Sequence, residues 1–132
     1  MAISKNLEIK INNDTATFNE NFYIYQYDRG IDLYIKVSIH KLQIRNRNIS
    51  MLSELEEAKA GVTILAPNGK IMGEYNLEVV NDAIKFRIDK ELTDEMDEIG
   101  IYKMQFHLYD GNDNRITIPP VAIEVKELMG VL

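Results

Sequence analysis

The most regular pattern along the chain is an alternation of apolar and polar residues that begins at residue 31. Ile31, Leu33, Ile35, Val37 and Ile39 share one parity, and mostly polar residues fill the other. Successive side chains of a strand point to opposite faces. This segment therefore predicts a strand with one buried face and one mostly solvent-exposed face.

Shorter segments of the same kind predict further strands. Their approximate bounds are 7–11, 22–27, 60–65, 70–75, 83–88, 101–108 and 115–125, and residues 77–80 either continue the 70–75 strand or start another short one. Between two of them, Pro67-Asn68-Gly69 predicts a tight hairpin turn, because Asn and Gly tolerate positive φ. In the last segment the apolar parity shifts across two consecutive prolines, which predicts a bulge or a change of sheet there.

The stretch 50–59 breaks this pattern and predicts a short helical insert. Leu52 and Leu55 fall on one face of it at helical spacing. We favour a lid over the edge or end of the sheets, with a partner-binding helix as the alternative. A second helical turn is predicted at 92–96, with Thr93 as its cap.

The segment that opens the 101–108 strand carries a motif of its own. Glu98, Gly100, Tyr102 and Met104 have the acidic-x-Gly-x-Tyr-x-Cys spacing of a tyrosine corner, with methionine in the place of cysteine. Gly100 permits a tight turn, and the Tyr102 hydroxyl reaches a backbone carbonyl upstream. The motif predicts that Tyr102 and Met104 point into the core.

Seven to eight strands, without alternating helices, predict an all-β fold: an immunoglobulin-like antiparallel β-sandwich with one short helical insert. A closed barrel built from similar strands stays open as an alternative. The length of 132 residues predicts a single domain over 1–132, with its core at about 7–128.

Composition narrows the possible functions. The net charge of −6 argues against a nucleic-acid partner, since phosphate backbones are bound by clustered Lys and Arg. There is no run of about 18 apolar residues to enter a membrane, and the first residues do not resemble a secretory signal peptide. With no cysteine, the chain has neither disulfides nor a thiolate nucleophile.

The sequence contains few patterns that are typical of catalytic or ligand-binding sites. The two histidines, His40 and His107, fall on the predicted outward parity of strands, so we expect both at the surface. The glycines are dispersed and form no phosphate-binding loop. We therefore predict no catalytic residues, no cofactor and no metal site.

Aromatic side chains are the more promising surface feature. Tyr23, Tyr25, Tyr27 and Tyr34 are candidate interface residues, together with Leu52 and Leu55 of the predicted helix. Tyrosines are enriched at protein interfaces, and exposed aromatic rows also bind sugars. Cross-strand packing is the alternative without a function.

The ordered series of strands and turns resembles the N-terminal domain of phage baseplate upper proteins. The resemblance spans about Leu7 to Leu128 and is carried by the strand 31–39, the strand 62–65 with its Pro67-Asn68-Gly69-Lys70 turn, the strand 84–88, and the segment from Gly100 to Phe106. These motifs are patterns of strands and turns and carry no chemical signature.

The resemblance implies a structural, non-enzymatic protein of the tail tip of a phage or prophage of Gram-positive bacteria. Such a domain anchors a longer, usually trimeric protein to the baseplate hub, and the rest supports receptor-binding proteins for host attachment. It would be part of the virion and made in the host cytoplasm. Family members continue into a shaft, toward which residues 129–132 would lead, so we expect a fragment or a shortened member. The alternative is a carbohydrate-binding β-sandwich module that recognises cell-wall glycans.

Overall fold

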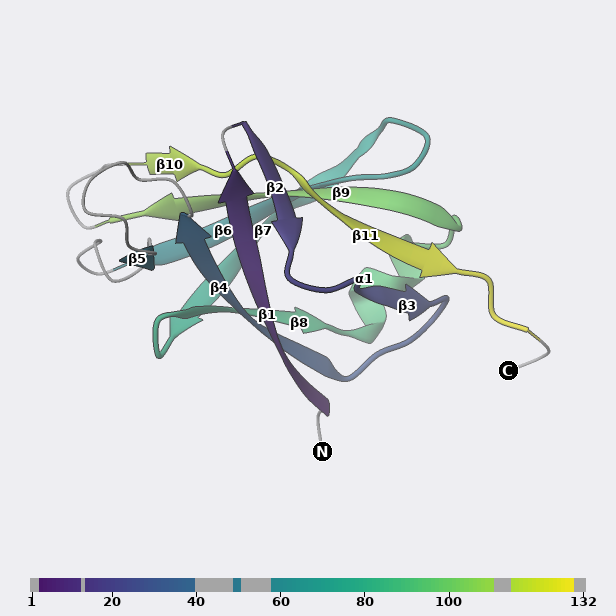
Figure 1. Cartoon of the computed structure of the whole chain (residues 1–132). Coiled ribbons are helices and arrows are strands. Elements are labelled where there is room, and N and C mark those ends of the chain that lie inside the picture. Colours follow the sequence, from purple (N-terminus) through teal and green to yellow (C-terminus); the bar gives the residue numbers. More distant parts are fainter. Residues whose placement is uncertain (1–2, 13, 40–48, 51–57, 111–114, 130–132) are drawn as a thin grey trace.

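The computed structural model describes residues 3–12, 14–39, 49–50, 58–110 and 115–129. This part of the chain is almost entirely β structure with one short helix, α1 (Lys90–Glu95) (Figure 1). Its strands are β1 (Ile3–Asn12), β2 (Thr15–Phe18), β3 (Tyr23–Tyr25), β4 (Ile31–Ile39), β5 (Ile49–Ser50), β6 (Lys59–Leu65), β7 (Ile71–Val80), β8 (Ala83–Ile88), β9 (Gly100–Tyr109), β10 (Arg115–Thr117) and β11 (Val121–Lys126).

The strands form one sheet that curls into two layers. Its hydrogen-bonded order is β2-β1-β4-β8-β7-β6-β9-β11-β3, with β5 on β4 and β10 on β9. The long strand β7 changes its neighbour along its length, because 71–77 pair with β6 and 78–80 pair with β8. We call the side with β1, β2, β4 and β8 the first layer, and the side with β3, β6, β9 and β11 the second layer.

The core lies between the layers and is built from the inward parity of both. Phe86 of β8 meets Phe106 of β9 edge to face, with ring centroids 6.4 Å apart. The main buried side chains are Leu7, Ile9, Leu33, Ile35, Val37, Ile84, Phe86 and Ile88 from the first layer, and Ile24, Val62, Ile64, Tyr102, Met104, Phe106, Leu108, Val121, Ile123 and Val125 from the second. Burial of this apolar surface is the main driving force for folding.

The predicted all-β, sandwich-like class is confirmed, but the expected antiparallel arrangement is corrected. Strand β1 runs parallel to β4, with Ile3 opposite Ile31 and Ile11 opposite Ile39. Strand β3 also runs parallel to β11. Alternation determines which face of a strand is buried and is the same for both directions, so it could not distinguish them.

The number of strands also exceeds the expected seven to eight, because several short strands escape a search for alternation. Two of them, β10 and β11, arise from the predicted 115–125 segment, which divides at the two prolines as expected. Within the described residues, the order begins at β2 and ends at β3 without closing, so the sheet is not a closed barrel.

The predicted hairpin between 60–65 and 70–75 is confirmed. Strands β6 and β7 pair antiparallel, and the turn between them contains a hydrogen bond from Gly69 N to Ala66 O of 2.9 Å. Gly69 has a φ of 88°, the left-handed conformation that the Asn-Gly sequence predicts.

The helical predictions have mixed outcomes. Most of the predicted insert, residues 51–57, lies outside the described residues, while Ser50 belongs to β5 and Lys59 to β6. Helix α1 begins two residues earlier than the predicted turn. Its cap is Asp89, whose carboxylate accepts a 3.0 Å hydrogen bond from Leu92 N. Thr93 is not the cap, because it is buried inside the helix and its hydroxyl donates to the Asp89 carbonyl.

Candidate functional site

The tyrosine corner positions the exposed face that is the best candidate site. The Tyr102 hydroxyl donates a 2.6 Å hydrogen bond to the Glu98 carbonyl, as the motif requires. Gly100 has a φ of 133° and lies so close to Pro67 that an added Cβ would be 3.2 Å from its ring. Tyr102 and Met104 are buried. Ile99 and Ile101, which precede Tyr102, lie at the surface.

Strand pairing joins Ile101 to the exposed tyrosines of β3. Glu124 on β11 lies opposite Ile101 on one side and Tyr23 on the other, and Lys126 lies opposite Tyr25. We call the outward side of these strands the Tyr–Ile face; it comprises Tyr23, Tyr25, Ile101, Lys103, Ala122, Glu124 and Lys126. Five of these residues line a shallow depression of about 340 Å³ together with Asn21 and Phe22.

The Tyr–Ile face is unusually apolar for an exposed surface. Ile101 is 48% exposed, Tyr23 is 45% exposed, and Ile99 in the preceding turn is also exposed. Tyr23 and Tyr25 meet edge to face with centroids 5.8 Å apart, and the Lys126 ammonium lies 3.9 Å from the Tyr23 ring centroid. These contacts hold both aromatic rings in place. The face is therefore largely preformed.

The predicted interface residues do not all gather on this face. Tyr27 is exposed in the turn after β3, where it has a φ of 67°. Tyr34 is half-buried on β4 in the first layer, opposite Asn6 and Lys85. Leu52 and Leu55 lie outside the described residues. Of the predicted residues that the structure describes, only Tyr23 and Tyr25 lie together on one face.

Sequence reasoning missed Ile101 and Lys126 as members of this face. The outward position of Ile101 follows from the corner motif, since Tyr102 must point inward. An isoleucine on the outward parity is thus a signal that the sequence already contained. The pairing of β3 with β11, which adds the tyrosines, joins segments about a hundred residues apart and leaves no local signal.

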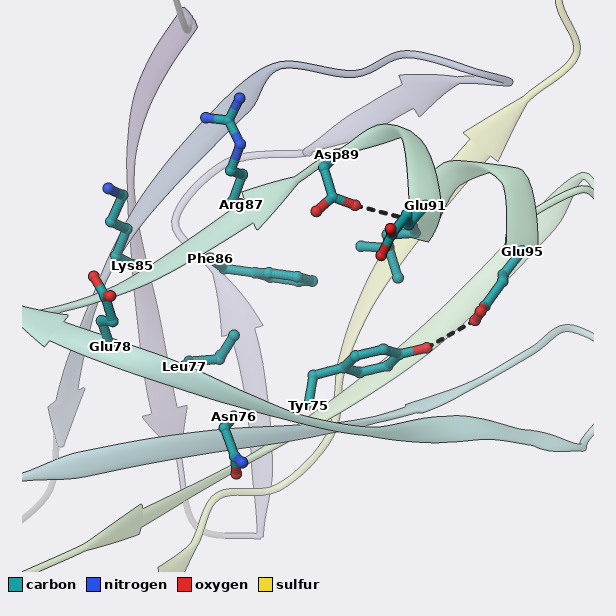
Figure 2. A pocket seen from close by; sticks show the side chains of 11 residues that line it. Tyr75, Asn76, Leu77, Glu78, Lys85, Phe86, Arg87, Asp89, Glu91 and Glu95 are labelled. Atoms are coloured by element: carbon teal, nitrogen blue, oxygen red, sulfur yellow. Dashed lines mark hydrogen bonds between the residues drawn. The ribbon is translucent and has the colours of Figure 1, made fainter.

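A second depression lies where β7 leaves β8, beside α1 (Figure 2). It has a volume of about 370 Å³ and is lined by Tyr75, Asn76, Leu77, Glu78, Lys85, Phe86, Arg87, Asp89, Glu91, Leu92 and Glu95. Figure 2 shows Tyr75 and Glu95 pointing toward each other, and their hydrogen bond is 3.0 Å long. Burial raises the pKa of Tyr75, and the bond to Glu95 raises it further. This contact ties α1 to β7.

Several of the charged side chains that line the second depression have structural contacts. Its lining contains no histidine, serine or threonine. The guanidinium of Arg87 forms a 3.0 Å ion pair with Asp32, and Asp89 caps α1. Together with Glu95, which bonds to Tyr75, these charged groups stabilise the fold. Across the described residues, no group of three or more His, Asp or Glu side chains is placed to hold a metal ion.

The expectation for His107 is wrong. It is only 7% exposed, because side chains of β6 and β10 cover it on the outer side of β9. His40 lies outside the described residues. In the part of the chain that the structure describes, no helix has the length and apolarity needed to cross a bilayer.

The fold defines an all-β, sandwich-like domain of mixed strand direction. No known protein family and no curated protein matches the sequence. Among solved structures, the chain is similar to the N-terminal domain of phage TP901-1 ORF48. That similarity has a TM-score of 0.61 at 7% identity and covers 94% of this chain and 98% of that one.

A weaker similarity is to CopC from Methylosinus trichosporium OB3b, with a TM-score of 0.45 at 9% identity, covering 85% of this chain and 89% of that one. The predicted resemblance to the N-terminal domain of a phage baseplate protein is confirmed at the level of the fold by the similarity to the phage TP901-1 domain.

Proposed function

We propose that this chain is a structural component of a phage tail or baseplate that works by docking to other proteins and not by catalysis. The observation that carries the proposal is the shared fold with a phage domain over 94% of this chain and 98% of the other. Because fold alone does not determine function, the surface must supply the rest of the argument.

The Tyr–Ile face is the surface that we assign to docking. Exposed aromatic and aliphatic side chains held in fixed positions are typical of the centres of protein interfaces. On a chain of net charge −6, this face carries Lys103 and Lys126 against the single acid Glu124. The partner that fits is a protein surface with aliphatic side chains flanked by carboxylates.

The finer assignment follows the sequence resemblance. The domain would dock to the tail-tip hub, and the protein that contains it would support the receptor-binding proteins for host attachment. In a full-length protein the assembly would be a homotrimer. The protein would be made in the host cytoplasm and function in the virion.

The test uses the purified domain and the hub protein of its phage at tens of micromolar, a range in which weak interfaces are measurable. We expect co-elution in size-exclusion chromatography and a heat signal in calorimetry. Ile101→Asp should abolish binding, because it places a charge at the centre of an apolar contact. Ile3→Asp is the matched control, since Ile3 is an exposed isoleucine on β1 in the first layer.

The possible outcomes test the proposed function and the choice of docking face separately. If the folded wild-type domain does not bind the hub or any other baseplate protein, the proposed function is rejected. If Ile101→Asp binds as tightly as wild type, the docking face is wrong while the function stands. Equal losses for Ile101→Asp and Ile3→Asp would also reject the face.

The geometry does not favour the carbohydrate-binding alternative. Sugar rings stack on open aromatic faces, but the Lys126 ammonium lies over the Tyr23 ring. The rings of Tyr23 and Tyr25 stand at 86° to each other and therefore form no flat platform. Cell-wall sugars should leave the chemical shifts of Tyr23, Tyr25 and Tyr27 unchanged.

A further inference from the structure

The outer side of the second layer holds a buried histidine at the end opposite to the Tyr–Ile face. His107 lies on β9 between Gly61 of β6 and Thr117 of β10. Its Nε2 is 3.2 Å from Thr63 Oγ1. Its Nδ1 is 3.1 Å from Thr117 Oγ1 and 3.1 Å from Arg115 Nη2.

These contacts determine where the ring proton sits. The Arg115 guanidinium has only N–H donors, so Nδ1 must accept from it and carries no proton. The proton of the neutral ring is then on Nε2, which donates to Thr63 Oγ1. The neutral ring thus joins Thr63 of β6 to Arg115 of β10, and the bond from Arg115 exists only in this neutral form.

Protonation would set two cations against each other. A proton on Nδ1 removes the acceptor of Arg115 and leaves the imidazolium 3.1 Å from the guanidinium. Among the described residues, the other ionisable groups on neighbouring positions are Glu74 on β7, Lys59 on β6, Tyr109 on β9 and Asp110 directly after it. Tyr109 also lies under the Arg115 guanidinium, at 5.6 Å. Among the described groups that shift the pKa of His107, Glu74 is the one that favours its positive charge.

Strand β10 is short, and besides the His107 contacts it is held by Ile116, which packs against the core, and by the buried Ile118 just after it. It is three residues long, and within the described residues it pairs only with β9. It covers the edge of β9 from His107 to Tyr109, while β11 covers the same edge from Gly100 to Met104. Loss of β10 would therefore uncover a strand edge, which is a template for pairing with another chain.

We propose that His107 is an acid-sensitive latch: the neutral ring holds β10 against β9, and its protonation expels Arg115 and loosens β10. The inference is independent of the docking role proposed above.

The direction of the pH dependence follows from the environment of the ring. Burial lowers the pKa of His107 and Arg115 lowers it further, whereas Glu74 raises it. A group whose folded-state pKa is depressed contributes stability above its unfolded pKa, which is about 6.5 for histidine. That stability is lost as the pH falls through the lower folded value. The latch is thus closed at neutral pH and opens on acidification.

Amide hydrogen exchange measured by NMR on the full chain tests the latch. The Ile118 N–H bonds to the Phe106 carbonyl, so the Ile116 N–H, two residues earlier, also faces β9. We expect the Ile116 amide to lose up to about tenfold of its protection between about pH 7.5 and about pH 5.5, after correction for intrinsic rates. The Ile123 amide of β11 should keep its protection.

Three variants make the test specific. In His107→Gln the Ile116 amide should keep its protection on acidification. His40→Gln, which removes the only other histidine, should behave as wild type. Arg115→Gln should raise the pH at which the His107 ring titrates and should reduce the acid loss. The proposal is overturned if wild-type protection at Ile116 does not change with pH, if His107→Gln loses as much as wild type, or if Arg115→Gln leaves the His107 titration unmoved.

Discussion

At the scale of single residues, Tyr102 shows how one hydroxyl positions a strand. Its 2.6 Å bond to the Glu98 carbonyl ties the start of β9 to the turn before it. Tyr102→Phe keeps the buried ring and removes only this bond, so we expect a loss of about 1 kcal/mol in the free energy of unfolding. Urea denaturation measures the loss, with Tyr23→Phe on the exposed face as control. Equal midpoints for the two variants would show that the bond contributes nothing.

Gly100 offers a second prediction at this scale. Its φ of 133° is a conformation that residues with a Cβ rarely adopt, and an added Cβ would be 3.2 Å from Pro67. Gly100→Ala should therefore destabilise the domain by about 1–3 kcal/mol. Gly30 also has positive φ, but nothing lies within 4 Å of an added Cβ. Gly30→Ala should cost less, and thermal unfolding of both variants compares them. A smaller loss at Gly100 than at Gly30 would contradict this account.

His107 is the residue that sequence reasoning placed wrongly. Its parity is outward, as predicted, but an outward side chain is exposed only if its neighbours leave it uncovered. Thr63, Arg115 and Thr117 close over it from two other strands. Their approach depends on the register of β6 and β10 on β9, and one sequence does not reveal register between distant segments.

At the scale of elements, helix α1 contains both a helix cap and a surface ion pair, and the two should contribute differently to stability. The Asp89 carboxylate accepts from Leu92 N inside a partly buried turn. The exposed Asp94 pairs with Lys90 at 2.9 Å, four residues away. Asp89→Ala should cost about 1 kcal/mol because the cap is lost. Asp94→Ala should cost a few tenths of a kcal/mol, because solvent screens the pair.

Chemical denaturation at moderate salt checks the comparison. Raising the salt concentration should erase the small effect of Asp94→Ala and leave that of Asp89→Ala in place. A larger loss for Asp94→Ala than for Asp89→Ala would contradict the assignment of the cap.

The elements themselves were largely predictable. Alternation located the long strands, the Pro67-Asn68-Gly69 turn located the hairpin, and the two prolines located the break between β10 and β11. What alternation could not supply was strand direction, so the parallel pairs β1–β4 and β3–β11 were missed. The cap of α1 was missed because both Asp89 and Thr93 belong to residue types that cap helices.

At the scale of the whole molecule, the sequence predicted the two tyrosines of the candidate site but not the isoleucine beside them. Tyr23 and Tyr25 were chosen for their residue type, and they do lie on one exposed face. Ile101 joins them only through β11, which pairs with β3 on one side and β9 on the other. That arrangement is a property of the fold and not of any local segment.

The change of neighbour along β7 predicts how the molecule unfolds. Since β7 belongs to both layers and the layers share one core, melting of either layer uncovers the buried side chains of the other. The slowest amides of β4 and β9 should therefore report the same free energy of opening by native-state hydrogen exchange. Values that differ by more than about 1 kcal/mol would mean that the layers open separately.

The division of the core has a consequence for synthesis on the ribosome. The strands β1, β2 and β4 come from the first part of the chain, and β9 and β11 come from its last third. The apolar side of β4 therefore has no β9 or β11 to cover it until those strands have been translated. Nascent chains that stop before β9 should expose this surface and be prone to aggregation or to capture by chaperones.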